Sequence, residues 1–123
     1  MAIGPLSFWG GIDWSDGRII DAHHPACGRS IAGTVLVMAY GRGSSSAAVV
    51  MAELIRADRA PAAVVMRSAD LILVVGAIAA RELYGLDLPV LQLDADGFDA
   101  VFALDGHRLA VTPEGSVRAT SEP

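Results

Sequence analysis

The sequence of 123 residues contains no lysine and a single cysteine. The absence of lysine excludes Schiff-base chemistry and a P-loop lysine. All nine basic side chains are arginines, set against 14 acidic ones, and the formal net charge is −5. A surface that follows nucleic-acid phosphates needs clustered lysine and arginine, so we do not expect nucleic-acid binding.

Because Cys27 is the only cysteine, no disulfide can form within the chain. One thiol also falls short of the ligands that a cysteine-bound iron–sulfur cluster or a structural zinc ion requires. We expect Cys27 to be a small packed residue rather than a reactive thiol.

Long apolar runs and targeting signals are also missing. The longest apolar run, residues 71–80, is about half of a membrane span. Residues 1–5 contain no basic segment followed by an apolar stretch, so no signal peptide is expected. The sequence predicts a soluble cytoplasmic protein without membrane contact.

Apolar residues are plentiful, at 53% of the chain, and charged residues make up 19%. This composition excludes disorder and suits a packed core. We expect a single domain over residues 1–123. So apolar a small domain has little polar surface, which favours a subunit that buries part of its surface against a partner.

The order of apolar runs predicts a layered α/β fold with mixed sheets. Buried strands are expected over residues 34–40, 62–66 and 89–93. Helices are expected over 47–57 and 71–84, the second capped by Asp70 and ended by Gly85. A strand over 6–9, a hairpin partner over 18–20 and an irregular segment over 21–28 precede them. A C-terminal β-meander over 100–104, 109–112 and 117–119 completes the prediction, with turns at Asp105-Gly106 and Glu114-Gly115.

The most informative segment is Gly41-Arg42-Gly43-Ser44-Ser45-Ser46, between a predicted strand and a predicted helix. Open α/β sheets gather ligands at this position, and the unpaired N–H groups of a helix start hold anions. The same environment favours the anionic form of a serine that acts as a base. A serine that merely caps the helix within a flexible loop explains the pattern equally well. A hydrolase triad has no support, because no histidine or aspartate is close to Ser44 in sequence.

Several motifs taken together resemble the small subunit of aconitase X enzymes. They are LSFWGGID at 6–13, GRIID at 17–21, His24-Pro25, Gly28, SIAG at 30–33, the 41–46 loop, APAA at 60–63, Gly76-Ala77 and Pro89. The resemblance covers nearly all of the chain before the C-terminal meander. It implies the swivelling β/β/α domain of aconitases, whose loop serine removes a proton from the substrate.

By this resemblance Ser44 is the catalytic base. The resemblance assigns substrate binding to the neighbouring loop residues Arg42, Gly43, Ser45 and Ser46. Ordinary aconitases have an arginine after the two serines, whereas this chain has Ser46. We therefore expect neither the ordinary aconitase anchor nor citrate as the substrate.

The resemblance also implies a partner and a cofactor. Family enzymes use an iron–sulfur cluster or iron centre, bound by a large subunit, to assist loss of the hydroxyl group. The expected assembly is a heterodimer, or a larger complex, with an aconitase X large subunit, and the expected reaction is dehydration of a small hydroxy acid. The GRGSSS form of the loop and the lysine-free composition favour cis-3-hydroxy-L-proline, which would give Δ1-pyrroline-2-carboxylate. The alternative is a phosphomevalonate dehydratase small subunit.

Functions of other classes remain open. The chain could carry a phosphoryl group on His23 or His24, or it could be a regulatory module that uses the 41–46 loop only to bind an anion. Adjacent histidines point in opposite directions, so we expect structural or interface roles for them rather than shared metal ligation. Trp9 and Trp14 are expected to be core or interface anchors, and His107 to be exposed without a function.

Overall fold

The computed structural model describes residues 1–41, 46–112 and 116–119. Its elements are β1 (Ala2–Ile3), α1 (Phe8–Gly11), β2 (Val35–Met38), α2 (Ala47–Arg56), β3 (Ala63–Met66), α3 (Leu71–Tyr84), β4 (Val90–Gln92), α4 (Ala95–Phe102), β5 (Leu109–Val111) and β6 (Val117–Ala119). The predicted α/β class is confirmed.

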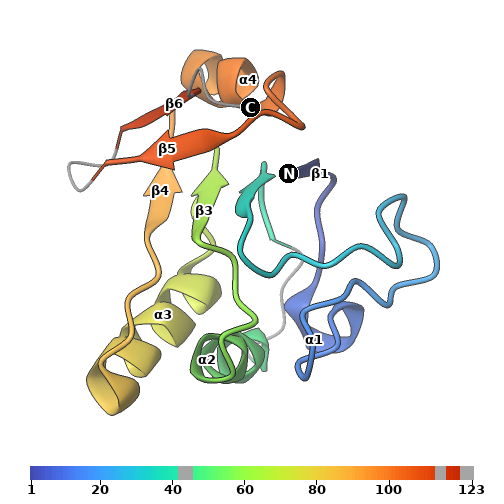
Figure 1. Ribbon diagram of the computed structural model, residues 1–123, viewed down its shortest axis with the longest axis vertical. Coiled ribbons are helices and arrows are strands. Elements are labelled where there is room, and N and C mark those ends of the chain that lie inside the picture. Colours follow the sequence, from blue (N-terminus) through green and yellow to red (C-terminus); the bar gives the residue numbers. More distant parts are fainter. Residues whose placement is uncertain (42–45, 113–115, 120–123) are drawn as a thin grey trace.

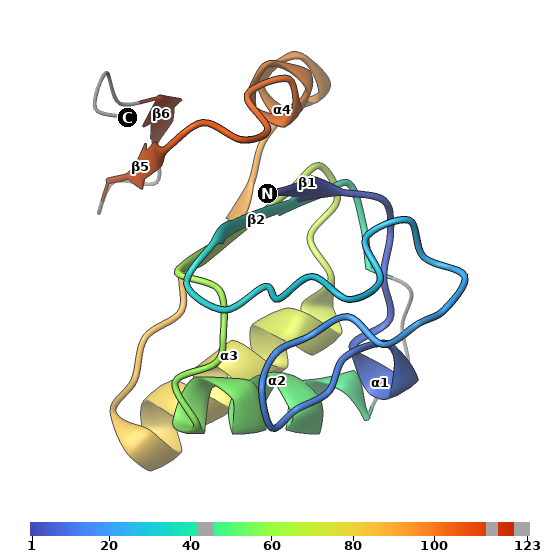
Figure 2. The same ribbon diagram turned by 45° about the vertical axis from the view of Figure 1, so that its right-hand side comes forward.

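The elements form three layers. The middle layer is a four-stranded sheet of order β1-β2-β3-β4 (Figure 1). All neighbouring strands in this sheet are parallel, whereas the separate β5–β6 sheet is antiparallel, so the fold combines sheets of both kinds. Helices α2 and α3 lie side by side on one face, and α4 and the antiparallel β5–β6 hairpin lie beyond the other (Figure 2). Parallel strands need crossovers: α2 supplies the one from β2 to β3, α3 supplies the one from β3 to β4, and residues 4–34 connect β1 to β2.

The two faces of the sheet have separate cores, as the alternation of side chains along a strand requires. In β2, Leu36 and Met38 join the core under α2 and α3, whereas Val37 packs with Phe98 and Val101 of α4. All four residues of β3 are buried, because both faces of this central strand are covered.

Helices α2 and α3 approach each other closely at Gly76. A Cβ atom at this position would lie 2.7 Å from the carbonyl oxygen of Ala48 and 2.9 Å from the Cβ of Met51. Helix α3 also has the predicted ends. The Asp70 side chain accepts hydrogen bonds from the N–H groups of Ile72 and Leu73, and Gly85 ends the helix with a φ of 67°.

The predicted strand over residues 6–9 is wrong. Residues 8–11 form the short turn α1, in which Trp9 and Gly10 have non-helical dihedral angles and Gly10 has a φ of 82°. Phe8 and Gly11 are buried, and the turn brings Gly11 against Leu6. The first strand is instead β1, two residues long and therefore too short to show a period of two.

Residues 18–20 make single antiparallel bridges, from Ile19 to Ile12 and from Arg18 to Ser30, rather than a hairpin strand. The segment over 21–28 is irregular, as predicted. Many backbone hydrogen bonds of residues 21–28 are made within turns, such as the bond from the Cys27 N–H to the His24 carbonyl at 3.0 Å.

The predicted strand over residues 100–104 is also wrong, because helix α4 occupies most of it. Asp94 caps this helix by accepting a hydrogen bond from the N–H of Gly97 at 2.7 Å. Phe98 and Val101, three residues apart, then point at the sheet. The meander is thus reduced to the β5–β6 hairpin. The Asp105-Gly106 turn forms, and the predicted Glu114-Gly115 turn lies outside the described residues.

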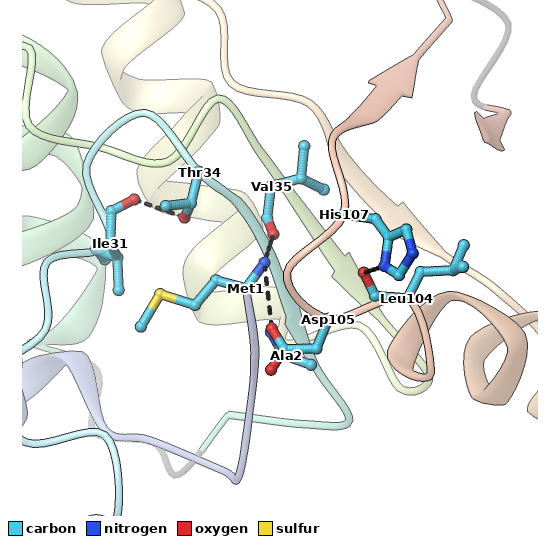
Figure 3. Close-up of polar contacts among 8 residues, drawn as sticks. All are labelled: Met1, Ala2, Ile31, Thr34, Val35, Leu104, Asp105 and His107. Atoms are coloured by element: carbon cyan, nitrogen blue, oxygen red, sulfur yellow. Dashed lines mark hydrogen bonds and ion pairs between the residues drawn. The ribbon is translucent and has the colours of Figure 1, made fainter. Parts of the chain in front are cut away.

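The C-terminal layer is attached to the first strand through Asp105 (Figure 3). The Ala2 N–H donates to its carboxylate at 2.8 Å. The Met1 amino group donates to the Val35 carbonyl at 2.9 Å and lies 3.9 Å from the same carboxylate. Burial lowers the pKa of this amino group, and the charge of Asp105 opposes the shift. Among helices in the described parts of the chain, none is long and apolar enough to cross a membrane.

Candidate active site

The carboxyl ends of the parallel strands lie at one edge of the sheet, where helices α1, α2 and α3 also begin (Figure 2). Residues 39–41 follow β2 at this edge, and residues 67–70 follow β3. Open α/β sheets bind ligands at such an edge. The starts of α2 and α3 add the positive ends of two helix dipoles.

Asp70 lies at the centre of this edge. Its Oδ1 accepts a hydrogen bond from the N–H of Ile72 at 2.9 Å, while its Oδ2 lies directly beside Gly41. A Cβ atom on Gly41 would collide with that carboxylate oxygen, so any larger residue at this position would require the Asp70 side chain to move. Asp70 is half-buried and keeps one carboxylate oxygen against the start of the loop.

A surface hollow of about 400 Å³ adjoins the two residues. It is lined by Tyr40, Gly41, Ser68, Ala69, Asp70, Leu71 and Ile72. The hollow thus offers hydroxyl groups, one carboxylate and the backbone at a helix start to a small polar ligand.

Backbone hydrogen bonds fix the strand ends around the hollow. The Ala39 carbonyl accepts from the N–H groups of Arg67 at 3.1 Å and Ser68 at 2.9 Å. The Gln92 side chain, at the end of β4, accepts from the Ala69 N–H at 3.0 Å. Three neighbouring strands are therefore joined just where the hollow begins.

Of the predicted site residues, Ser46 is described at the N-cap of α2. Its carbonyl accepts from the N–H groups of Val49 and Val50 at 3.2 and 3.3 Å. The remaining candidates, Arg42, Gly43, Ser44 and Ser45, lie outside the described residues. Sequence reasoning missed Asp70 and Gln92 as residues of this edge. Asp70 was recognised only as a helix cap, although a carboxylate shortly after a buried strand is also a signal for a ligand site.

His24 has a structural role, as predicted. Its ring is buried, its Nε2 lies 3.0 Å from the Gly4 carbonyl, and its Nδ1 accepts from the Ala26 N–H at 3.0 Å. Since Nδ1 accepts, Nε2 carries the proton and donates to Gly4. The histidine thereby attaches the irregular 21–28 segment to the end of β1.

Other predicted roles have mixed outcomes. Cys27 is exposed, so its prediction as a packed residue is wrong. It belongs to the turn that also contains the buried Ala26. His107 is exposed as predicted, with its Nδ1 3.2 Å from the Leu104 carbonyl (Figure 3). Trp9 and Trp14 are 57% and 56% exposed, which excludes a core role for both.

Within residues 1–41, 46–112 and 116–119, no group of three or more His, Cys, Asp or Glu side chains is placed to hold a metal ion. The described part of the chain therefore does not fit an iron–sulfur cluster or iron centre.

Comparison with known proteins gives consistent results. A family model described as the aconitase X swivel domain matches residues 1–118. The chain is 47% identical to the cis-3-hydroxy-L-proline dehydratase of Pseudomonas aeruginosa, in an alignment that covers 85% of this chain and 18% of that protein. It is 40% identical to the phosphomevalonate dehydratase small subunit of Methanothermobacter thermautotrophicus, covering 75% of this chain and 79% of that one. The chain thus spans less than a fifth of the hydroxyproline dehydratase.

Two solved structures are also similar. The holo form of Thermococcus kodakaraensis aconitase X matches with a TM-score of 0.60 and 38% identity, covering 64% of this chain and 63% of that one. The solution NMR structure of a UPF0107 protein matches with a TM-score of 0.78 and 31% identity, covering 98% and 88%.

Proposed function

The chain belongs to the aconitase X swivel-domain family, and from that premise we propose that it is the small subunit of a two-chain dehydratase. We further propose that residues 1–123 form one swivel domain. The observation that carries the proposal is the juxtaposition of the Asp70 carboxylate, Gly41 and the starts of two helices at one sheet edge.

The proposed reaction is dehydration of cis-3-hydroxy-L-proline to Δ1-pyrroline-2-carboxylate. Removal of the α-proton and loss of the 3-hydroxyl as water give an enamine, which tautomerises to the cyclic imine. The substrate is a zwitterion, with a carboxylate and a secondary ammonium group on the same carbon. Helix N-termini suit the carboxylate, and the Asp70 side chain suits the ammonium group. The 47% identity to the Pseudomonas dehydratase supports the same substrate.

In this proposal Ser44 takes the α-proton, a role that rests on the family resemblance. The positive end of α2 favours the alkoxide form of a serine at the loop. Arg42, Gly43, Ser45 and Ser46 would bind the carboxylate, and donors on a carboxylate make the α-proton more acidic. This chain would thus orient the substrate and remove the proton.

The partner is proposed to be an aconitase X large subunit, in a heterodimer or a larger complex. Small subunits of phosphomevalonate dehydratases are among the relatives of this chain. The iron–sulfur cluster or iron centre of the family would be bound by that large subunit. Its chemistry would be to assist departure of the hydroxyl group.

The test is co-expression with the candidate large subunit, purification, and an anaerobic assay with cis-3-hydroxy-L-proline. We expect turnover only when both chains are present. Ser44→Ala should leave the complex intact and remove most of the turnover, whereas Ser116→Ala, at an exposed position outside the site, should leave turnover unchanged. Near-normal activity of the Ser44→Ala variant would refute the assignment of the base.

A second candidate is the phosphomevalonate dehydratase small subunit. It is supported by the 40% identity to the Methanothermobacter small subunit, in an alignment that covers 79% of that protein. The Asp70 carboxylate argues against it, since a phosphate group in the hollow would be repelled. Assaying both substrates with the same purified pair distinguishes the two candidates.

Non-catalytic functions have weaker support. A phosphohistidine carrier would need a free ring nitrogen, and both ring nitrogens of His24 are hydrogen-bonded inside the fold, so this function would depend on the exposed His23. The test is incubation with a phosphoryl donor. Phosphohistidine that forms in the unmodified chain and is absent from a His23→Gln or a His24→Gln variant would support the carrier function. A regulatory module that only binds an anion through the 41–46 loop would leave the partner's turnover unchanged.

A further inference from the structure

We propose that an exposed surface formed by Trp9, Trp14 and Ile20, here called the tryptophan face, is the docking site for the large subunit. The inference rests on the proposed function and names the surface through which the two chains meet. The three side chains are 57%, 56% and 48% exposed. Tryptophan is the residue most enriched among those that dominate binding energy at protein interfaces.

The tryptophan face is hollowed, which suits a protein partner. A depression of about 480 Å³ is lined by Trp9, Gly10, Ile12, Asp13, Trp14, Ile20 and Val50. Most of these side chains are apolar, and Asp13 is the one acidic residue among them. Concave apolar surfaces bordered by polar residues are common at protein interfaces.

Local backbone geometry holds Trp9 outward. Its neighbours Phe8 and Ile12 are 1% and 3% exposed, so the turn α1 is anchored in the core on both sides of it. The backbone leaves helical geometry at Trp9, and Gly10 follows with a φ of 82°. A side chain presented from an anchored turn loses little entropy on binding.

Trp14 is presented from a second fixed turn. The Asp13 carboxylate accepts hydrogen bonds from the Ser15 N–H at 2.9 Å and the Ser15 hydroxyl at 2.6 Å. The Asp13 carbonyl accepts from the Gly17 N–H at 2.8 Å, which closes the turn. The backbone turns that carry both tryptophans are therefore fixed before a partner arrives.

The tryptophan face is next to the candidate active site. Val50, in the first turns of α2, lines the hollow, and α1 contacts α2 where that helix begins (Figure 1). A partner seated on Trp9 and Trp14 would therefore reach the sheet edge that holds Gly41 and Asp70. A large subunit that completes the site has to reach this edge.

The length of one relative indicates the kind of partner. The region that matches this chain accounts for only 18% of the Pseudomonas dehydratase, so there it is covalently continuous with a much longer chain. In a two-chain enzyme, the contacts between this domain and the remaining part of the enzyme must form between separate subunits. The partner surface that fits is apolar with an arginine or lysine facing Asp13, because Asp13 is the one acidic residue that lines the hollow.

A second apolar surface provides a matched control. Val75 and Ile78 on the outer face of α3 are 56% and 55% exposed, as much as the two tryptophans. They belong to an aliphatic stripe on one helix, and Ile78 lines a smaller hollow of about 180 Å³. Substituting them removes similar apolar exposure at a different place.

The experiment measures the dissociation constant between the full small subunit and the purified large subunit. Trp9→Ser and Trp14→Ser should each weaken binding by about 30-fold or more, the effect typical of a dominant interface residue. The Val75→Ser/Ile78→Ser variant should bind like the unmodified chain. Thermal unfolding of each isolated variant should match that of the unmodified chain, since the substituted side chains are mostly exposed.

A second measurement avoids variants altogether. In the unmodified complex, oxidation of Trp9 and Trp14 by N-bromosuccinimide, followed by mass spectrometry, should be slower than in the free small subunit. Unchanged oxidation together with unchanged affinity of the tryptophan variants would overturn the proposal. So would weakened binding in the α3 variant alone, or a homodimer of this chain that the tryptophan substitutions dissociate.

The outcomes separate the two proposals. Binding that depends on the tryptophans, without turnover of either substrate, supports the docking site and contradicts the dehydratase function. Turnover by a pair whose affinity is unchanged in the tryptophan variants supports the dehydratase function and contradicts the docking site. If the two chains do not bind at all, the docking site is refuted.

Discussion

Asp70 has two separable roles that a pair of substitutions can distinguish. Its Oδ1 caps α3 through the Ile72 N–H at 2.9 Å and the Leu73 N–H at 3.4 Å, and its Oδ2 lies against Gly41. Asparagine caps helices about as well as aspartate but carries no charge. Asp70→Asn therefore removes the charge while keeping the cap, and Asp70→Ala removes both.

The expected losses follow from these contacts. Loss of an N-cap costs about 1 kcal/mol, which for a domain of this size lowers the melting temperature by about 4 °C. We expect this decrease for Asp70→Ala and no more than half of it for Asp70→Asn. A charged hydrogen bond to the substrate ammonium is worth about 1.5–3 kcal/mol, and partial exposure reduces it to about 1 kcal/mol. Both variants should therefore lose about five-fold in kcat/KM for cis-3-hydroxy-L-proline.

The assay combines thermal unfolding of the isolated chain with steady-state kinetics of the two-chain enzyme. For a substrate that carries a phosphate and no ammonium group, Asp70→Asn should not lower kcat/KM and should leave it unchanged or raise it. If Asp70→Asn leaves kcat/KM for the imino acid unchanged, the ammonium contact is refuted. If Asp70→Ala melts at the temperature of the unmodified chain, the reasoning about the cap is refuted.

Three further predictions concern the fold. Gly76→Ala should lower the free energy of unfolding by about 1–3 kcal/mol in urea titrations, despite the better helix propensity of alanine, because its Cβ meets the Ala48 carbonyl at 2.7 Å. His24→Ala should lower it by about 2–4 kcal/mol in the same titrations, because the Gly4 carbonyl and Ala26 N–H lose their partner. Ser15→Ala should raise the pKa of Asp13 in an NMR titration, because hydrogen bonds from Ser15 hold that pKa below its ordinary value.

The sign of the Asp13 effect also fixes its pH dependence. A carboxyl group whose pKa is lowered by folding stabilises the fold above its unfolded pKa, and this contribution is lost as the pH falls through the folded pKa. Ser15→Ala should therefore reduce the difference in the free energy of unfolding between neutral and acidic pH.

Val75→Ala on the exposed face of α3 is the control for Gly76→Ala. Equal destabilisation by both substitutions would contradict the argument that α2 and α3 approach closely at Gly76.

The parts of the fold that could be predicted are those whose signals are local. Asp70 and Gly85 mark the ends of α3 in the sequence itself, and the AVVM run of β3 is apolar because both its faces are buried. Helix α4 was missed because only two of its residues, Phe98 and Val101, are buried, and the surface they meet belongs to distant strands. Two such residues are too few to establish a helical period.

The candidate site shows the same limit. The 41–46 loop could be identified from its glycines and serines, but the proximity of Asp70 depends on the pairing of β2 with β3. Likewise, the support that Gln92 gives to residue 69 depends on β4 lying beside β3. Contacts between segments that are far apart in sequence leave no local pattern, so the sequence could not place these two side chains in the site.

The strands of the main sheet lie in the same order as they occur in the chain, and this order has a consequence for synthesis on the ribosome. Each new strand can add to the growing edge as it emerges, with α2 and α3 covering one face in turn. The other face is covered only when Phe98, Val101 and the β5–β6 hairpin have been synthesised, and these come last in the chain. Until then Val37 and Val65 have no cover, so a nascent or truncated chain that ends before α4 is exposed to aggregation. The last quarter of the sequence thus protects the second face of the sheet while the domain is being made.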